Sequence, residues 1–205
     1  MNYYGQFGDD KIIESFFEKD YIGGCIDVGA SNGISINNTK HFEELGWYCL
    51  CIEPNPKYFE YLKYNRLHAI NYAISNKNDK LPFNIIDLGN GCEDAISSLE
   101  LDTRLVEKHK QLGYYINPKI VMVDVITLDY CIENFYKYDK IDFVSIDTEG
   151  TELDVLKGFS IEKWNPKLIV IENNFDDPDI EIYLNMYNYK KNKRIEVNDY
   201  YIKTI

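Results

Sequence analysis

The sequence predicts an α/β fold in which a mostly parallel central sheet of about seven strands has helices on both faces and an antiparallel edge. First, short apolar runs alternate with helical stretches along the 205-residue chain, as they do in a parallel sheet with crossover helices. Second, these runs are continuously apolar, as expected of strands that are covered on both faces. Third, two strand-like runs close the chain with no helical stretch between them, which predicts the antiparallel edge.

The predicted elements begin with a short amphipathic helix that Asp9 or Asp10 can cap. Gly23-Gly24 then breaks the chain before the first strand, Cys25–Val28. Further strands are predicted at Trp47–Ile52, Ala69–Ile74, Lys119–Val123, Ile141–Ile146 and Leu168–Ile171. The helices between them are predicted at Ser35–Leu45, Pro56–Arg66, Leu128–Tyr136 and Glu152–Leu156.

Two segments depart from this alternation. Leu81–Asp87 has the composition of an extra strand, and Asn90–Tyr115 has a charged helical pattern. We interpret residues 90–115 as an insertion before the fourth main strand that would cover the active site. A last helix around Pro178–Tyr187 and strands at Arg194–Val197 and Tyr200–Thr204 complete the prediction. Because no repeat, linker or low-complexity segment occurs, residues 1–205 are expected to form a single domain.

Charge and cysteine content narrow the class of protein. Thirty-four acidic residues outnumber 22 basic ones, and the formal net charge of -12 disfavours a nucleic-acid partner because the average field repels phosphates. The basic run Lys190–Arg194 is interpreted as a solvated turn. Five cysteines without a CxxC pair indicate neither a disulfide framework nor a zinc site. Since no signal-peptide pattern and no apolar stretch of membrane-spanning length occurs, a cytoplasmic protein is expected.

The first predicted strand continues into a glycine-containing loop that can hold a ligand. Asp27 to Gly33 has the pattern D-x-G-x-x-x-G, whereas the dinucleotide fingerprint is G-x-G-x-x-G. An acidic residue in this loop would repel a pyrophosphate but suits the ammonium and sulfonium groups of S-adenosylmethionine, so a dehydrogenase is the weakest alternative. The loop residues predicted to bind this cofactor are Asp27, Gly29, Ala30, Ser31, Asn32 and Gly33.

Two further strand ends are predicted to complete the cofactor site. Glu53 ends the second strand about 20 residues after the loop, where a carboxylate can accept hydrogen bonds from both ribose hydroxyls. Pro54 and Asn55 lie beside it, and an ordinary helix cap is the alternative role for Glu53. Ala73 and Ile74 end the third strand, where small and apolar side chains can line the adenine.

Four separate blocks of the sequence resemble one known family. They are Ile26–Gly33 with Asn38-Thr39 and Leu45–Trp47, Cys51–Pro56 with Asn65-Arg66, Ile141–Glu152 with Leu156–Phe159, and Ile171–Asn174. Their order and spacing, over roughly Asp9 to Tyr189, are similar to those of the FkbM-type methyltransferases. The resemblance implies an S-adenosylmethionine-dependent O-methyltransferase with a Rossmann-like class I methyltransferase fold, and many relatives methylate hydroxyls of sugars or secondary metabolites. Asn37 departs from the related pattern, which often has Ser there.

Methyl transfer to a hydroxyl requires alignment of the reacting atoms and removal of the hydroxyl proton. Asp147 and Glu172 end strands that we expect to be parallel neighbours, so their carboxylates should meet beside the cofactor. Asp147 is the predicted general base and Glu149 the second candidate, with capping of the helix near Gly150 as the alternative for Glu149. In another interpretation, Asp147, Glu172 and Asn173 bind a divalent cation such as Mg²⁺, an arrangement that resembles that of metal-dependent catechol-type methyltransferases.

Other polar residues are candidates for the vicinity of cofactor or acceptor. Asn38 and Thr39 follow the loop by one turn and can contact the methionine end or the acceptor. His41, on the same helix, can reach the acceptor side, with a packed or exposed position as the alternative. Ser98 lies in the insertion, where it can border the acceptor site or cap a helix. The other two histidines are interpreted as structural or exposed.

The predicted acceptor is a hydroxyl of a sugar or glycan. The alternatives are a small metabolite, an RNA ribose, or a cofactor-binding subunit that does not catalyse transfer. RNA ribose enzymes often use a Lys-Asp-Lys-Glu tetrad, and the strand-end acids here have no suitably placed lysines. The expected partner is therefore a small-molecule or glycan acceptor, and neither a nucleic acid nor a membrane.

Overall fold

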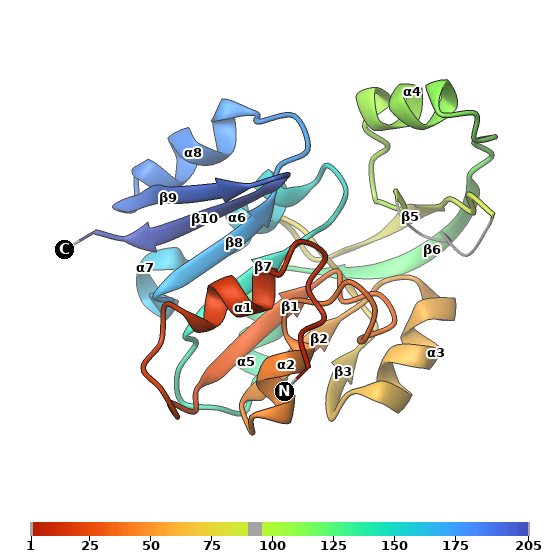
Figure 1. Cartoon of the computed structure of the whole chain (residues 1–205). Helices are drawn as coiled ribbons and strands as arrows, with labels where there is room; N and C mark the ends of the chain where they lie inside the picture. Colours follow the sequence, from red (N-terminus) through yellow and green to blue (C-terminus); the bar gives the residue numbers. More distant parts are fainter. Residues whose placement is uncertain (1, 90–95, 205) are drawn as a thin grey trace.

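The computed structural model describes residues 2–89 and 96–204. Its main sheet has seven strands in the order β3-β2-β1-β7-β8-β10-β9 (Figure 1). They are β1 (Gly24–Val28), β2 (Tyr48–Ile52), β3 (His68–Ile70), β7 (Phe143–Ile146), β8 (Leu168–Glu172), β9 (Tyr189–Ile195) and β10 (Asn198–Lys203). Within this sheet, the neighbouring strands β3, β2, β1, β7 and β8 are all parallel to one another. Strand β10 is antiparallel to both of its neighbours, β8 and β9. The predicted mostly parallel sheet with an antiparallel edge is confirmed.

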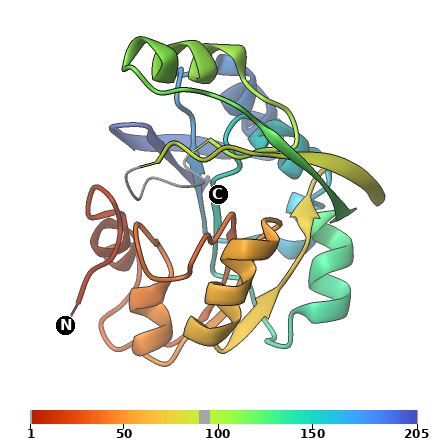
Figure 2. The same ribbon diagram turned by 90° about the vertical axis from the view of Figure 1, so that its right-hand side faces the viewer.

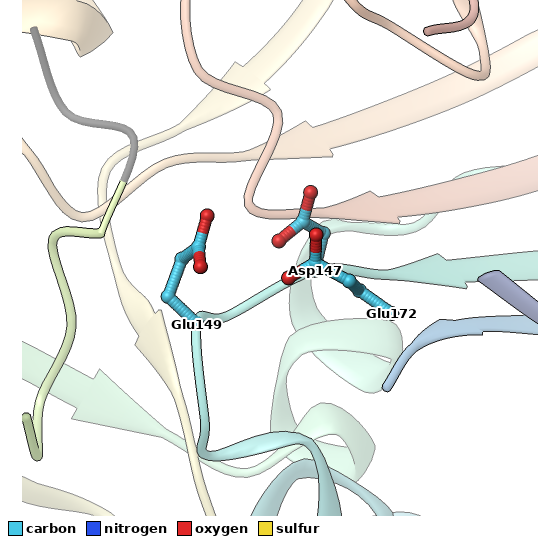
Figure 3. A group of neighbouring side chains, drawn as sticks. All are labelled: Asp147, Glu149 and Glu172. Atoms are coloured by element: carbon cyan, nitrogen blue, oxygen red, sulfur yellow. The ribbon is translucent and has the colours of Figure 1, made fainter. Parts of the chain in front are cut away.

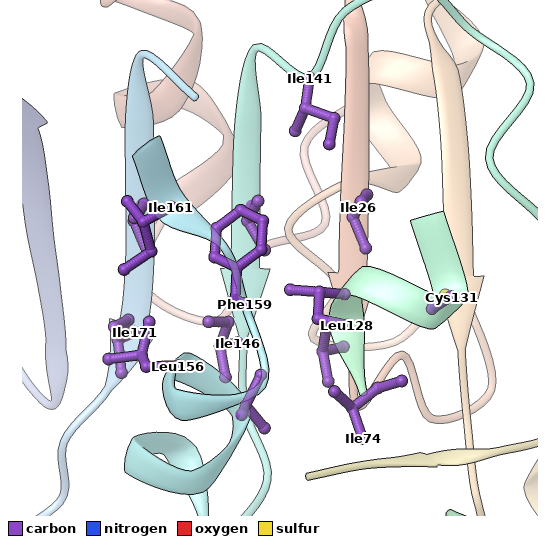
Figure 4. Close-up of a cluster of buried hydrophobic side chains, with 14 of the residues drawn as sticks. Ile26, Ile74, Leu128, Cys131, Ile141, Ile146, Leu156, Phe159, Ile161 and Ile171 are labelled. Atoms are coloured by element: carbon purple, nitrogen blue, oxygen red, sulfur yellow. The ribbon is translucent and has the colours of Figure 1, made fainter. Parts of the chain in front are cut away.

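Helices cover both faces of the main sheet (Figure 1). They are α1 (Asp9–Glu14), α2 (Lys40–Glu44), α3 (Pro56–Asn65), α5 (Leu128–Phe135), α6 (Glu152–Lys157), α7 (Ile161–Trp164) and α8 (Pro178–Asn185). Successive residues of β1 pack on opposite faces: Ile26 joins the cluster of Leu128 on α5 (Figure 4), and Cys25 joins that of Phe42 on α2. Burial on both faces explains why the strands are continuously apolar. No helix in the described part of the chain is long and apolar enough to span a bilayer.

A second, three-stranded sheet has the order β4-β6-β5. It consists of β4 (Ala73–Ile74), β5 (Asp79–Ile85) and β6 (Lys119–Ile126), with β4 parallel and β5 antiparallel to β6. The predicted strand Ala69–Ile74 is thus divided between the two sheets, and Lys119–Val123 is not a strand of the main sheet. The division occurs at Asn71, whose Nδ2 donates to the backbone oxygens of Glu53 and Pro54 and turns the chain after β3. Because β6 belongs to the second sheet, the strand that pairs with β1 in the main sheet is β7.

The helix predicted at Ser35–Leu45 is shorter in the structure, where α2 begins at Lys40. The preceding residues form turns, and Ile36 has a φ of 53°. A β-branched residue in this left-handed region is incompatible with a regular α-helix. Asn32 supports the turn, because its Oδ1 accepts a hydrogen bond of 2.9 Å from the backbone N–H of Ile34.

The helix α4 (Thr103–Gln111) stands apart from the helices of the main sheet (Figures 1 and 2). Of the predicted insertion, residues 90–95 lie outside the described residues, and α4 accounts for much of the remainder. Leu105 is buried in a small apolar cluster against which Phe175 packs. Arg104 donates to both carboxylate oxygens of Asp177, at 2.8 and 2.6 Å. These contacts connect α4 to the segment between β8 and α8.

Candidate active site

A cavity of about 500 Å³ lies at the carboxyl ends of the parallel strands β1, β2, β7 and β8. This is the edge of an open α/β sheet where ligands bind. Many of the predicted site residues line this first cavity, namely Gly29, Ser31, Asn32, Glu53, Pro54, Ala73, Ile74, Asp147, Glu149 and Glu172. The topology thus collects residues that are up to 143 positions apart in the printed sequence, from Gly29 to Glu172.

Gly29 lies where the ends of β1 and β7 meet. Its φ is 86°, and a side-chain Cβ at this position would overlap the backbone oxygen of Asp147. The backbone N–H of Gly29 donates to the carbonyl of Ile52, which ends β2, at 3.0 Å. Only glycine satisfies both the backbone conformation and the close approach, so the loop can pass directly beneath the cavity.

Glu53 is held rigidly beside this loop. Its Oε2 accepts from the backbone N–H of Ser31 at 2.8 Å, and its Oε1 accepts from that of Asn55 at 2.7 Å. The side chain is 4% exposed and lines the first cavity. The carboxylate therefore has a fixed orientation at the wall formed by Pro54 and Ala73.

Asp27 does not line the cavity, which corrects its predicted role as a direct cofactor ligand. Its Oδ2 accepts hydrogen bonds from Asn37 Nδ2 at 2.9 Å and Thr39 Oγ1 at 2.7 Å. Arg66 in turn donates to Asn37 Oδ1 and Thr39 Oγ1, and pairs with Glu43 at 3.1 Å. Burial raises the pKa of Asp27, while the charge of Arg66 acts in the opposite direction. The motif carboxylate thus organises a buried polar network behind the loop.

Three more residues predicted to bind the cofactor have packing roles in the structure. Ala30 is 2% exposed in the apolar cluster beneath α2, and a side chain at Gly33 would collide with Leu62 and Arg66. Asn55 is fully buried and caps α3, where its Oδ1 accepts from a backbone N–H. None of these three residues lines the first cavity, because their side chains or close contacts fill the space behind it.

The residues predicted near the acceptor also lie behind the cavity wall. Asn38 Nδ2 donates to Ser145 Oγ at 3.1 Å, and Thr39 belongs to the network of Asp27. His41 is 1% exposed, and its ring packs in a tilted arrangement against Tyr3, with the ring centroids 4.5 Å apart. Ser98 is 1% exposed and forms a β-bridge. Its neighbour Ser97 lines the cavity instead.

Asp147, Glu149 and Glu172 form a compact group, with one carboxylate oxygen of each lying within 4.8 Å of the others (Figure 3). Asp147 and Glu172 adjoin the paired positions Ile146 and Ile171 of the parallel strands β7 and β8. Burial, followed by the negative charge of Glu152, raises the pKa of Asp147 to about 7. Burial and the charge of Asp147 raise the pKa of Glu172 well above its ordinary value. The carboxylate oxygens of Asp147 and Glu172 lie within 4.8 Å of each other, so the two carboxyls influence each other's protonation and titrate as a pair.

Asn173 is turned away from this group, which corrects the predicted metal ligand set. Its Nδ2 donates to Asp199 Oδ2 at 3.2 Å, and its Oδ1 accepts from the backbone N–H of Asp177 at 2.8 Å. Successive side chains of an extended chain point to opposite sides, so Glu172 and Asn173 cannot serve the same ion. Among the described residues, the group that could hold a cation contains Glu149 instead. Three carboxylates are ligands that suit Mg²⁺ or Ca²⁺.

Sequence reasoning placed residues 90–115 over the active site but did not identify the residues of α4 that line the cavity. Leu105, Lys108 and His109 all line it, and their spacing places them on one face of the helix. The positive charge of Lys108 opposes the rise in the pKa of Glu172. The helical spacing was visible in the sequence, but nothing in it showed which wall of the cavity this face would form. Tyr72, beside the predicted adenine residues, was also missed.

Comparison with solved structures places the fold. The "METTL16 MTase domain (crystal form 2)" has a TM-score of 0.50 and 12% identity over 95% of this chain and 65% of that chain. "M. capricolum TrmK in complex with the natural cofactor product S-adenosyl-homocysteine (SAH)" has a TM-score of 0.47 and 12% identity, over 94% of this chain and 65% of that one. The chain therefore spans 65% of the length of each structure. At this identity, the likeness to the METTL16 domain concerns the fold alone.

Residues 27–191 carry the family relationship of this chain. No curated protein matches this chain. The family model described as "Methyltransferase FkbM domain" matches residues 27–191, from the end of β1 into β9. This range contains the loop at Gly29, the ribose candidate Glu53 and the carboxylates at the ends of β7 and β8. The chain therefore belongs to the FkbM methyltransferase domain family.

Proposed function

We propose that this FkbM-family methyltransferase transfers the methyl group of S-adenosylmethionine to a hydroxyl group of a sugar or glycan. The observation that carries the proposal is the group formed by Asp147, Glu149 and Glu172, in the same cavity as the loop at Gly29. In the reaction the carbon–sulfur bond breaks, a carbon–oxygen bond forms, and the hydroxyl loses its proton. A carboxylate beside the cofactor is suited to accept that proton.

The cavity walls fit the chemical parts of S-adenosylmethionine. The volume of about 500 Å³ lies within the range of small-molecule sites. Glu53 would accept hydrogen bonds from the ribose hydroxyls, and its contacts with Ser31 and Asn55 keep it oriented for that role. Ala73 and Ile74 are small and apolar, as an adenine wall should be, and both line the cavity. When bound, the cofactor supplies a methyl group on a sulfonium, which is already activated for displacement.

Asp147 is the general base in this proposal. It follows β7 directly, and the backbone at Gly29 approaches it closely, so it lies beside the end of the cofactor loop. A base whose pKa lies near the working pH combines sufficient basicity with a substantial ionised fraction. A carboxylate oxygen of Glu172 lies within 4.8 Å of one of Asp147, and Glu149 faces the same space (Figure 3).

A divalent cation bound by Asp147, Glu149 and Glu172 is the second form of this proposal. The proximity of their carboxylates, within 4.8 Å, favours it. Such an ion would lower the pKa of the acceptor hydroxyl, in place of direct proton transfer to a carboxylate. The two forms differ in their expected response to chelation of divalent cations.

The proposal is tested by incubating the purified chain with methyl-labelled S-adenosylmethionine and separate panels of glycans, small hydroxylated metabolites and RNA transcripts. We expect S-adenosylhomocysteine to form in step with a labelled methyl ether on a sugar hydroxyl. Label on nitrogen, on carbon or on RNA ribose would contradict the proposed reaction. Binding of S-adenosylmethionine without turnover on any panel would favour the non-catalytic alternative.

A further inference from the structure

A second cavity of about 270 Å³ adjoins the first and extends the site toward α8. Leu105, Glu172 and Asn174 line both cavities, so these side chains form the shared wall. Asn174 Nδ2 donates to Glu172 Oε2 at 2.8 Å, which holds the two polar groups of this wall together. Glu172, which lies beside Asp147 in the first cavity, thus also faces the second cavity.

The second cavity combines apolar and hydrogen-bonding surfaces. Leu105, Leu153 and Ile180 contribute apolar side chains, while Glu172 and Asn174 contribute carboxylate and amide groups. A sugar ring presents the same combination, with apolar C–H groups and hydroxyls that can donate to carboxylates. The volume of about 270 Å³ lies just below the range of about 300–1,000 Å³ that drug-sized ligands occupy, so it suits a single ring better than a nucleotide.

The charges of this cavity disfavour an anionic ligand. Five carboxylates line it, and Arg104 is the one cation among its described lining residues. Arg104 is already engaged by Asp102 and Asp177, with distances of 2.6 Å to each, and its guanidinium lies 4.2 Å from the ring of Phe175. Asp179 remains to repel a phosphate, which would find no unengaged cation on the cavity wall.

We propose that the second cavity binds the sugar ring of the acceptor, with the reacting hydroxyl at the wall formed by Glu172 and Asn174, and that it selects neutral or amino sugars over phosphorylated ones. The inference rests on the proposed function, because it assigns the first cavity to the cofactor. In this arrangement the cofactor and the acceptor occupy adjoining cavities that meet at Glu172 and Asn174. The ring also lies against the segment that connects β8 to α8, which α4 holds in place through Arg104.

Saturation-transfer NMR and calorimetry in the presence of S-adenosylhomocysteine would test this assignment with three probes: methyl glucoside, glucosamine and glucose 6-phosphate. We expect methyl glucoside and glucosamine to bind with millimolar Kd, and glucose 6-phosphate to bind at least tenfold more weakly. Equal or tighter binding of the phosphorylated sugar, or binding of none of the three, would overturn the proposal. Because no methyl transfer is required, the result is separable from that of the transferase assay. Sugars that bind without being methylated would contradict the proposed reaction and leave the subsite standing.

Two variants locate the sugar. Leu153→Trp should fill the second cavity and weaken sugar binding at least fivefold, with the Kd for S-adenosylhomocysteine unchanged within twofold. Asn174→Ala, a smaller change at the wall shared by the two cavities, should also weaken sugar binding if the larger variant does not fold. The matched controls are Leu112→Trp, at a side chain that is 66% exposed, and Asn134→Ala, on the exposed surface of α5. If sugar binding is the same in Asn174→Ala as in Asn134→Ala, the sugar does not lie in this cavity.

Discussion

Asp147 and Glu172 follow paired residues of the neighbouring parallel strands β7 and β8, and their carboxylate oxygens lie within 4.8 Å of each other. Two carboxyls at this distance, both partly removed from water, cannot ionise independently. The pair therefore retains a proton at a pH where isolated carboxyls are fully ionised. This relationship connects the fold to the chemistry, because the parallel register itself brings the two groups together.

Removing the proposed base should abolish transfer without affecting the cofactor site. Asp147→Asn is expected to lower kcat by about 10²–10⁴-fold, the usual contribution of a general base. The Kd for S-adenosylhomocysteine, measured by calorimetry, should remain within twofold. The control is Asp139→Asn, which changes an exposed carboxylate outside both cavities. Unchanged turnover in Asp147→Asn would exclude the proposed base.

The rate of methyl transfer should depend on pH through Asp147. Its pKa of about 7 means that the fraction in the basic form rises as the pH increases from 5 to 8. We therefore expect kcat/KM to increase with pH and to level off above about 7. A pH profile that is flat between pH 5 and 8 would contradict this assignment. The comparison must use conditions under which the protein remains folded across the range.

The same pair should make folding stability fall as the pH rises. A carboxyl whose pKa is raised in the folded state binds a proton more tightly there than in the unfolded chain, so the folded state loses relative stability on ionisation. For Asp147 the window runs from its ordinary pKa of 3.8 to about 7. Urea unfolding of wild type and Asp147→Asn should show a smaller decline for the variant across this window. Parallel slopes would show that Asp147 does not titrate in it.

Gly29 should tolerate no side chain. Gly29→Ala places a methyl group against the backbone oxygen of Asp147 and also forces alanine to a φ of 86°. We expect a loss of stability of more than about 2 kcal/mol, together with weaker binding of S-adenosylhomocysteine. Gly113→Ala is the matched control, because Gly113 has a φ of 90° but open space around it. Its cost should be limited to about 1–2 kcal/mol of backbone strain. Equal effects of the two substitutions would show that the contact with Asp147 is unimportant.

The buried network behind the cofactor loop should depend on Arg66. Arg66→Met leaves Glu43 and Asp27 without their cation, and removal of one partner from a buried ion pair costs about 3–5 kcal/mol. Arg104→Met breaks an ion pair whose arginine side chain is 48% exposed, and should cost about 1 kcal/mol or less. Denaturant unfolding of both variants measures the difference. A similar small loss in each would mean that the network contributes little to the stability of the loop.

The two forms of the proposed mechanism differ in their response to chelation. If Asp147, Glu149 and Glu172 bind Mg²⁺, EDTA should stop transfer and added Mg²⁺ should restore it. If Asp147 acts directly as the base, EDTA should leave the rate unchanged. Calorimetric titration with Mg²⁺ provides a second readout that does not require an acceptor. Insensitivity to EDTA together with no Mg²⁺ binding would exclude the cation form.

Much of the architecture could be predicted because it follows from apolar periodicity. Continuous apolar runs identified the strands of the main sheet that are covered on both faces, and parallel topology predicted that Asp147 and Glu172 would meet. The break at Asn71 was not predicted, because Ala69–Ile74 was interpreted as a single strand although the polar Asn71 interrupts its apolar residues. Its division into β3 and β4 depends on hydrogen bonds to Glu53 and Pro54, which belong to another segment.

The sequence by itself determined the class of fold, the family and the strand ends at which the site would form. It did not determine where individual side chains point. Asp27 and Asn173 both lie in predicted motifs, yet both side chains turn away from the first cavity, toward Thr39 and Asp199 respectively. Successive side chains of an extended chain point in opposite directions. A side chain one position along the strand therefore points into the protein interior instead of into the cavity. Only the tertiary structure decided this direction, and only it placed His109 of α4 opposite the strand ends, because these contacts join segments far apart in the chain.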